Sequence, residues 1–334
     1  MEIVKILVIR FSSIGDIVLT TPVVRNLKEQ CEGAEIHYLT KKQYKGLLED
    51  NPYVDHIHTL DRSFGELIAE LRNEHFHYII DLHNNLRTAR VKLRLHTVSF
   101  KFNKLNREKW LMVNFKKNKL PDLHIVDRYM ETINVFIDGN DMQGLDFFIP
   151  DEDVINISTF PEIYHSGYIA FAIGAQHFTK RLPLDKIISI CKKINRPVVL
   201  LGDKLDAPVA EKVKSAVGDN IFDACGKFNI NQSASIVQKA ELVISHDTGL
   251  MHIAAALKKK IISVWGNTIP EFGMYPYLSD EKSEIIEVKG LKCRPCSKIG
   301  HNKCPKKHFK CMNDIDESRI VSLCDTIFNG KAIV

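Results

Sequence analysis

The sequence lacks the features that would place it outside the ordinary globular proteins. No apolar run approaches the ~18 residues that a membrane-spanning helix needs. Eight cysteines among 334 residues are too few for a disulfide scaffold, which favours a cytoplasmic protein with reduced thiols. Hydrophobic residues make up 45% and charged residues 26% of the chain, and these values exclude a disordered or collagen-like protein. A chain of this length predicts two domains or one large one.

Apolar runs of strand length alternate with amphipathic stretches in both halves of the sequence. The predicted strands are residues 4–9, 35–39, 54–60, 78–82, 168–173, 197–201, 242–245 and 261–265. The predicted helices are residues 17–30, a stretch around Leu47, and residues 67–71, 126–136, 184–194, 207–217, 232–240 and 250–257. Pro22 predicts that the first of these helices begins late or is kinked. The alternation predicts an α/β fold with right-handed βαβ units and parallel sheets.

A segment without periodicity separates the two halves. Residues 140–165 contain Gly144, Pro150 and Pro161 and show no sustained apolar spacing. We therefore predict an N-terminal domain of residues 1–155 and a C-terminal domain of residues 156–334. Both are expected to be Rossmann-like, and the last helix is left free to pack back on the first domain. Ligands of doubly wound sheets bind at the carboxyl ends of the strands, so polar residues that follow strands are the site candidates.

The first polar motif, residues 10–16, follows the first predicted strand and opens the first helix. The dinucleotide fingerprint G-x-G-x-x-G is absent from it. Gly15 allows a tight turn, while Ser12 and Ser13 offer hydroxyl and N–H groups beside a helix N-terminus, an arrangement that binds anions. Taken alone, the motif favours a plain helix N-cap for Asp16.

The second motif, residues 245–257, again joins a strand end, a polar turn and a helix. Asp247 and Thr248 can cap this helix, whose free N–H groups and positive dipole end suit a diphosphate. His252 lies one turn into the helix on the face of Thr248 and Gly249. We expect it at the mouth of a cleft rather than in the core.

A third motif, residues 179–183, follows the predicted strand that ends near residue 173. Its Lys180 is placed either to neutralise a phosphate or to serve as an ordinary surface lysine before a helix.

Positive charge is concentrated between residues 86 and 120. Glu108 is the one acid there, and the basic residues are Arg87, Arg90, Lys92, Arg94, Lys101, Lys104, Arg107, Lys109, Lys116, Lys117 and Lys119. Four aromatic residues in the segment indicate that it folds. It is either the solvated face of one or two helices or a surface for phosphates, anionic lipid or nucleic acid.

Two further patterns concern metals. Cys293, Cys296, Cys304 and Cys311 have the spacing C-x2-C-x7-C-x6-C, which brings a tetrahedral zinc within reach. The second pair is spaced more widely than in a zinc knuckle, so free thiols are favoured over a structural zinc. The Asp-x-Asp spellings at 151–153 and 314–316 fall in loops, and we interpret neither as a metal site.

The three motifs in this order, S-S-I-G-D, K-R-L-P and D-T-G-L-M-H-I-A-A-A-L, resemble glycosyltransferase family 9, the heptosyltransferases of lipopolysaccharide core synthesis. The resemblance covers nearly the whole chain and extends to residues 81–87, 226–227 and 265–268. It implies a GT-B fold in which two Rossmann-like domains face each other across a cleft. The first domain would hold the acceptor and the second the nucleotide sugar.

The resemblance also implies roles for residues. Asp16 stands where the family's proposed general base stands, and Lys180 where a lysine contacts the donor phosphate. The donor-binding set is Ser12, Ser13, Gly15, Phe228, Asp247, Thr248, Gly249 and His252. The acceptor-binding set, drawn from the basic segment, is Arg87, Arg90 and Arg94. The sequence departs from the family at Phe228, where some members have a methionine lining the adenine pocket. It departs again at Arg181 and Leu182, which replace an aromatic residue.

The implied activity is an inverting, metal-independent transfer of heptose from ADP-heptose to a lipid-linked inner-core acceptor of lipopolysaccharide. No cofactor and no nucleic acid are expected. A cytoplasmic location is expected, and contact with the inner face of the cytoplasmic membrane stays open. The alternatives are a transferase that uses another nucleotide sugar, a GT-B-like epimerase or phosphorylase, and a nucleic-acid-binding protein. The last has no helix-turn-helix, zinc-finger or RNP pattern in its favour.

Overall fold

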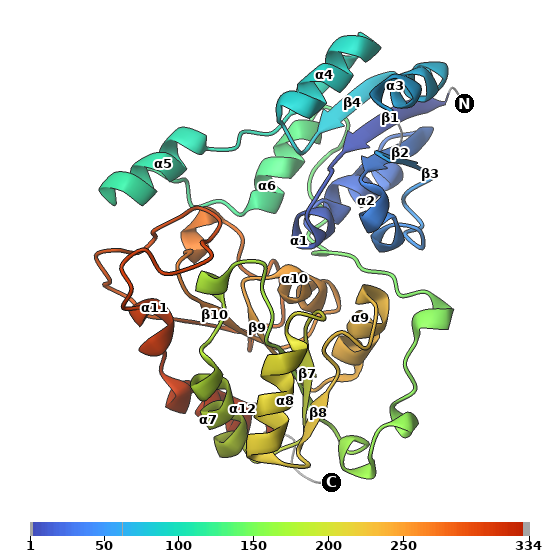
Figure 1. The fold of residues 1–334 in the computed structure, drawn as a ribbon. Helices are drawn as coiled ribbons and strands as arrows, with labels where there is room; N and C mark the ends of the chain where they lie inside the picture. Colours follow the sequence, from blue (N-terminus) through green and yellow to red (C-terminus); the bar gives the residue numbers. More distant parts are fainter. Residues whose placement is uncertain (1–2, 62, 330–334) are drawn as a thin grey trace. The chain divides into compact units, whose positions relative to one another are not determined.

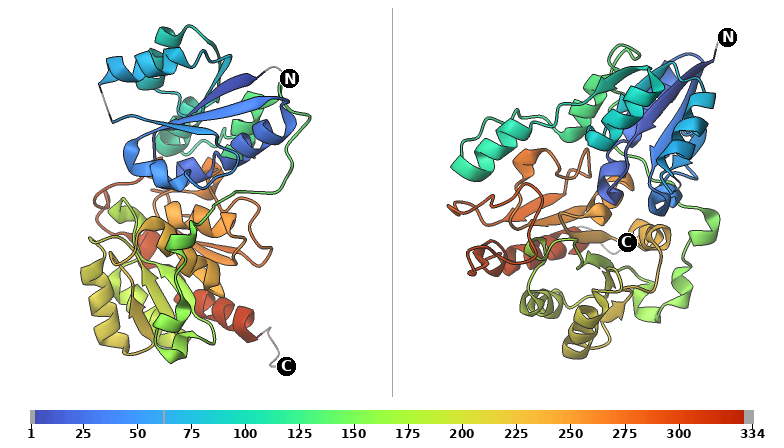
Figure 2. Two further views of the ribbon diagram at one scale, coloured as in Figure 1. Left: turned by 90° about the vertical axis from the view of Figure 1, so that its right-hand side faces the viewer. Right: turned by 45° about the horizontal axis from the view of Figure 1, so that its top comes forward.

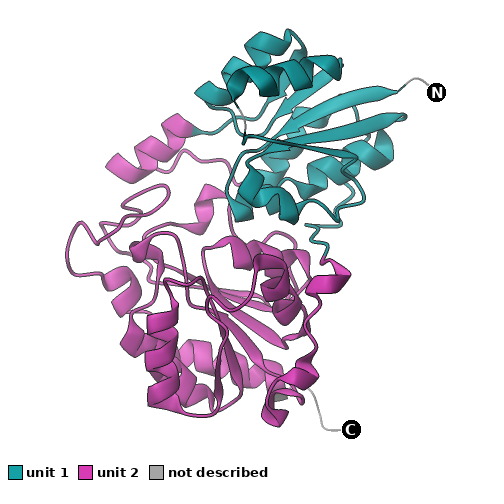
Figure 3. Ribbon diagram, turned by 45° about the vertical axis from the view of Figure 1, so that its right-hand side comes forward, with its two compact units in different colours: residues 1–105, 123–148 teal, residues 106–122, 149–334 magenta. Residues whose placement is uncertain are grey.

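The computed structural model describes residues 3–61 and 63–329 and divides the chain into two compact units (Figures 1 and 3). Unit 1 comprises residues 1–105 and 123–148, and unit 2 comprises residues 106–122 and 149–334. The predicted boundary after residue 155 therefore falls a few residues inside unit 2, in the irregular segment that was expected to join the domains. Residues 106–122, predicted for the first domain, group with unit 2.

Unit 1 is a five-stranded parallel sheet with strand order β3-β2-β1-β4-β5. The strands are β1 (Val4–Ile9), β2 (Ala34–Thr40), β3 (His56–Thr59), β4 (Tyr78–Asp81) and β5 (Val98–Lys101). The helices are α1 (Ile14–Val18), α2 (Thr21–Gln30), α3 (Phe64–Asn73), α4 (Leu86–Leu95) and α6 (Ile125–Met130). Helices α3 and α4 cover one face of the sheet and α2 and α6 the other (Figure 2). Buried aliphatic strand residues meet Leu67, Leu71 and Val91 under the first pair.

The predicted helix 17–30 is two helices. Helix α1 ends at Val18, and α2 starts at Thr21 with Pro22 in its first turn. Proline is tolerated there because the first N–H groups of a helix have no intrahelical acceptor. The late start that Pro22 predicted is therefore found as an interruption of the helix between Val18 and Thr21. Gly15 lies inside the first turn of α1 and not in the preceding turn, which corrects its expected role.

Unit 2 is a six-stranded parallel sheet with strand order β11-β10-β9-β6-β7-β8. The strands are β6 (Ile169–Ala172), β7 (Val198–Leu201), β8 (Ile221–Asp223), β9 (Leu242–His246), β10 (Ile261–Trp265) and β11 (Glu284–Glu287). The helices are α5 (Asn106–Phe115), α7 (Leu184–Ile194), α8 (Ala207–Val217), α9 (Ile230–Lys239), α10 (Gly249–Ala256), α11 (Lys310–Asn313) and α12 (Glu317–Asn329). Helices α7, α8 and α12 pack over the apolar cluster on one face, and α9 and α10 contact each other on the other face.

Two placements in unit 2 answer expectations from the sequence. Helix α12 packs on α7 of unit 2, where Lys186 and Lys193 pair with Glu317 at 2.9 Å each. The sequence of helix α5 has no apolar stripe, and accordingly the helix has no buried residue. Its segment is held to unit 2 by Lys109 over the ring of Phe272 and by a Lys116 Nζ hydrogen bond to the Pro295 carbonyl. The prediction of two doubly wound parallel α/β sheets is confirmed.

Candidate functional site

The order of strands fixes where each unit can hold a ligand. In unit 1 the chain moves outward from β1 to β2 and β3, then returns to the other side of β1 with β4. In unit 2 it does the same around β6, with β9 on the return side. The crevice outside the carboxyl ends of the two strands at such a switch point is the usual ligand site of an open α/β sheet. Residues after β1 and β4, and after β6 and β9, are therefore the structural candidates.

Asp16 lies after β1, at the unit 1 switch point, as the third residue of α1. Its Oδ2 accepts from the Ser13 N–H at 3.1 Å and from the Ser13 hydroxyl at 2.7 Å. Its Oδ1 pairs with Arg10 Nη2 at 2.6 Å. Ser13 is the N-cap, so Asp16 is the acid of a capping box rather than the N-cap that the motif alone favoured. The carboxylate is thus held in one orientation by contacts to both oxygens.

Arg10 stands in the first motif, but no role was predicted for it from the sequence. Its side chain is 9% exposed, and it also donates to the Leu82 and Ser12 carbonyls and to the Tyr129 hydroxyl. Burial opposes its charge, but the carboxylate of Asp16 together with the phenol groups of Tyr129 and Tyr38 outweighs burial and raises the pKa of Arg10 above its usual value. A cation directly after a buried strand was the available signal.

His83 and Asp81 follow from β4 on the other side of the switch point. Burial, reinforced by the charge of Arg10, lowers the pKa of His83 to about 4, so the ring is neutral at neutral pH. Asp81 is fully buried, pairs with Lys92 at 2.7 Å and accepts from the backbone N–H groups of His83 and Asn84. Through those contacts Asp81 stabilises the turn after β4. His83 is partly exposed and is therefore the more accessible of the two groups.

Two pockets open beside these residues within unit 1. One, of about 370 Å³, is lined by Ser12, His83, Arg87 and neighbouring residues. The other, of about 730 Å³, is lined by Arg87 and Arg90 together with residues of the β2–α3 region. The guanidinium of Arg87 lies over Phe11, after β1, and that of Arg90 over Phe64, in the first turn of α3.

Arg94, the third predicted acceptor residue, is also on α4 and exposed, but it lines neither of the two pockets. Lys41 lines both pockets and was missed, although it follows β2 and the strand-end rule could have found it.

At the unit 2 switch point, three turns converge. Lys180 lies in a single 3₁₀ turn after β6, and its Nζ pairs with Asp247 Oδ2, after β9, at 2.6 Å. The same oxygen accepts from the Thr268 hydroxyl, after β10, at 2.9 Å. Lys180 and Asp247 are 16% and 9% exposed. The carboxylate therefore fixes the ammonium group at the N-terminus of α10, where Thr248 is the N-cap and Gly249 the first helical residue.

Hydrogen bonds of the Thr179 hydroxyl join these turns to one another. Thr179 donates its hydroxyl to Asn267 Oδ1 at 3.0 Å and accepts the N–H of His301 at 2.8 Å. Gly266 is required because a Cβ there would lie 2.5 Å from the Thr179 carbonyl. Asn267 and Thr268 belong to the segment 265–268 that carries part of the family resemblance, but the sequence predicted no role for them or for His301.

The remaining candidates are spread along the same edge of the sheet. Phe228 follows β8 and has Phe160 as an aromatic neighbour, with ring centroids 6.4 Å apart. His252 was expected at the mouth of a cleft, but it is 2% exposed, because α10 buries most of its length. Ser12, Ser13 and Gly15, by contrast, belong to unit 1 with Asp16, whereas the other predicted donor residues belong to unit 2.

None of the four clustered cysteines forms a disulfide bond in the structure. Burial raises the pKa of Cys296, and raises that of Cys311 to about 12. Within the described residues, two sets of three ligand atoms lie within 4.8 Å of one another, and neither contains a cysteine.

The comparisons with known proteins agree with this arrangement. The family model for glycosyltransferase family 9 (heptosyltransferase) matches residues 64–307. Lipopolysaccharide heptosyltransferase 1 of Campylobacter coli is 24% identical, over 98% of this chain and 100% of that protein. Lipooligosaccharide heptosyltransferase 2 of Haemophilus influenzae is 26% identical, over 89% of this chain and 93% of that protein.

Solved structures show the same fold. The family 9 glycosyl transferase of Veillonella parvula has a TM-score of 0.78 at 21% identity and covers 99% of each chain. The E. coli ADP-heptose LPS heptosyltransferase II has a TM-score of 0.74 at 20% identity, over 98% of this chain and 100% of that one. The fold is GT-B. Since the family model spans well over half of the sequence, the chain belongs to glycosyltransferase family 9, the heptosyltransferases, and is a glycosyltransferase.

Proposed function

We propose that the chain transfers a heptose from ADP-heptose to an inner-core acceptor of lipopolysaccharide, with inversion and without a metal ion. The observation that carries the proposal is the ion pair between Lys180 and Asp247 at the unit 2 switch point, beside the N-terminus of α10. A fixed ammonium group and a row of free N–H groups form a cradle for a diphosphate. The solved E. coli relative is described as an ADP-heptose heptosyltransferase, which supports this donor.

In this proposal, the departing diphosphate is stabilised by Lys180 and by the backbone at Thr248 and Gly249. Phe228 is proposed to contact the adenine. His252 receives no charged role, because a positive imidazolium at its buried position would cost free energy.

The acceptor is proposed to bind in unit 1, where Arg87 and Arg90 line a pocket. Their charges suit an acceptor that carries phosphate and carboxylate groups. Asp16 is proposed as the general base that takes the proton of the attacking hydroxyl. An exposed arginine surface also leaves contact with an anionic membrane face open, and no helix in the described residues is long and apolar enough to cross a membrane.

The test is transfer from ADP-heptose to a heptose-free inner-core lipid, followed by mass spectrometry and by NMR of the anomeric centre. Product with inverted configuration is expected, and UDP- and GDP-sugars should give far less. Lys180→Met should weaken ADP binding by about 10–150-fold, the equivalent of the ~1.5–3 kcal/mol of a hydrogen bond to a charged group. Lys193→Met, which removes a surface ammonium in the same unit, is the control. A chain with full affinity for ADP after loss of Lys180 would contradict the donor site.

A further inference from the structure

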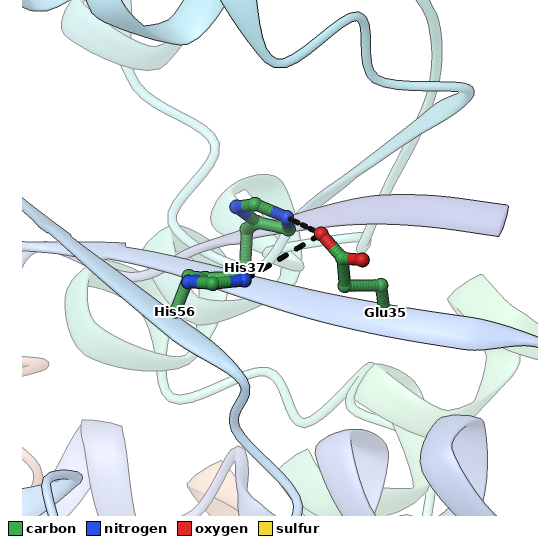
Figure 4. A group of neighbouring side chains, drawn as sticks. All are labelled: Glu35, His37 and His56. Carbon is green, nitrogen blue, oxygen red and sulfur yellow. Dashed lines mark hydrogen bonds and ion pairs between the residues drawn. The ribbon is translucent and has the colours of Figure 1, made fainter. Parts of the chain in front are cut away.

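A cluster of histidines and glutamates lies on unit 1, away from the strand ends that carry the transfer site. His37 in the middle of β2 pairs in register with His56 at the start of β3. Glu35 precedes His37 by two residues, so both side chains point to the same face of the sheet. Figure 4 shows Glu35, His37 and His56 converging, with one ring nitrogen of each histidine directed at the same carboxylate oxygen. The pleat and register of edge strand β3 and its neighbour β2 are enough to assemble this group.

The distances in the cluster are those between ligands of one small cation. Glu35 Oε1 lies 2.8 Å from His37 Nε2 and 3.6 Å from His56 Nε2. All three ligand atoms lie within 4.8 Å of one another. Ligands bound to tetrahedral zinc at its usual ~2.0–2.2 Å are about 3.3 Å apart, between these two values. The three atoms therefore need little movement to surround an ion.

A chain of hydrogen bonds behind His37 orients its ring. Glu70 Oε1 lies 2.6 Å from His58 Nδ1, and His58 Nε2 lies 2.9 Å from His37 Nδ1. When His58 donates to Glu70 and His37 donates to His58, the lone pair of His37 Nε2 points at Glu35. Metal-binding histidines are oriented by such carboxylate-backed hydrogen bonds on their second nitrogen.

The proton count of this chain leaves one position for a cation. Three contacts, Glu70–His58, His58–His37 and His37–Glu35, each need a proton if all are hydrogen bonds. Two neutral imidazoles supply two protons, because each carries a single N–H. The third contact needs either an additional proton or a metal ion between His37 and Glu35.

The local charge also leaves room for a dication. Glu35, Glu70 and Glu74 line the cluster, and Lys5 pairs with two of them, at 2.8 Å from Glu74 and 3.3 Å from Glu35. Carboxylates at this position favour a divalent cation, because opposite charges attract strongly at short range. A carboxylate beside a neutral imidazole is the protonation state that a metal requires.

We propose that Glu35, His37 and His56 form a binding site for a divalent transition-metal ion, with zinc as the best match. Nitrogen and carboxylate ligands without sulfur suit zinc, cobalt and nickel. His37 is 1% and His56 56% exposed, so one side of the ion is buried and the other open to water. The ion would pin edge strand β3 to β2, and it takes no part in the proposed transfer.

The experiment uses the full chain, stripped with a chelator and titrated with Co²⁺, whose absorption spectrum distinguishes thiolate from imidazole ligands. One equivalent should bind with a spectrum that lacks the sulfur charge-transfer band. Glu35→Gln and His56→Ala should each weaken binding tenfold or more. His75→Asn, at an exposed histidine outside the cluster, should bind as the unaltered chain does.

The result that overturns the proposal is unchanged cobalt binding in both Glu35→Gln and His56→Ala. A site that is lost only in a Cys293→Ser, Cys296→Ser double variant would also overturn it, because the ion would then belong to the cysteines. Melting temperatures without metal show whether the variants fold, and His56 is exposed enough for its loss to be tolerated. Transferase activity should not depend on the ion, so a failure of this site and a failure of the proposed function give different results.

Discussion

Replacing Asp16 by asparagine removes the proposed base while keeping its size. General-base catalysis contributes roughly 10²–10⁴-fold to the rate, equivalent to about 2.7–5.4 kcal/mol of transition-state stabilisation. We expect kcat to fall within that range at saturating concentrations of both substrates, while the KM of the donor stays unchanged, because the donor phosphates are proposed to bind in unit 2.

The variant should also lose some stability. Asp16 accepts from Arg10 on one oxygen and from Ser13 on the other, and an amide can present an oxygen to only one of them. Its NH₂ group must then face a donor, which leaves a partly buried donor without an acceptor and costs about 1–3 kcal/mol. The thermal and chemical denaturation midpoints should fall accordingly, with the chain still folded at 25 °C.

A matched control separates the two effects. Ser63 and Glu66 form the same capping box at α3 of unit 1, with contacts of 3.0 and 2.8 Å to one carboxylate oxygen. Glu66→Gln removes that acid at a residue that lines neither pocket, and it should leave kcat unchanged. The base assignment is refuted if Asp16→Asn keeps more than a tenth of the kcat, or if Glu66→Gln loses as much. Asp16 would then be a helix cap that holds Arg10.

Three further outcomes are expected. In steady-state kinetics, the double variant Arg87→Gln, Arg90→Gln should raise the KM of the acceptor about tenfold or more, with little change in the KM of the donor. Arg94→Gln, outside both pockets, should raise the acceptor KM less. Equal effects would mean that general surface charge, and not the pocket, attracts the acceptor. Burial lowers the pKa of His83 to about 4 from the usual 6.5. Between these two pH values the imidazole is protonated in the unfolded chain but stays neutral in the folded chain. Stability should therefore fall as the pH drops from 6.5 to 4, and a shallower fall in His83→Gln by urea denaturation is the check. Transfer should persist in excess chelator while the melting temperature falls; loss of activity that magnesium or manganese restores would contradict the metal-independent mechanism.

The interior strands of both sheets are predictable from sequence because they are continuous apolar runs. Central β6 is buried at every position and β1 at its last four, so composition alone marks them. Three edge strands, β5, β8 and β11, are only partly buried and were not predicted. Their strand character comes from pairing with a neighbour, which is a tertiary property.

The site was predictable only where a strand end stood beside a polar turn. Lys180 and Asp247 were found in this way, and the structure joins them by an ion pair. Arg10 and Thr268 stand in the first motif, residues 10–16, and in the segment 265–268, but no role was predicted for them, because their partners meet them only in the folded chain. The histidine pair on β2 and β3 depends on the register of two strands, which no local pattern specifies.

Residues 106–122 belong to unit 2 although the chain before and after them belongs to unit 1, and this limits how the two units can be exchanged between proteins. The chain passes between the units after residues 105, 122 and 148, so they are connected by three covalent crossings instead of one linker. A chimera that exchanges residues 149–334 with those of another family member would leave Trp110 and the rest of α5 attached to a foreign partner. Lys109 and Lys116 would lose Phe272 and the Pro295 carbonyl. Modular exchange in this chain therefore requires both pieces of unit 2 to be transplanted together.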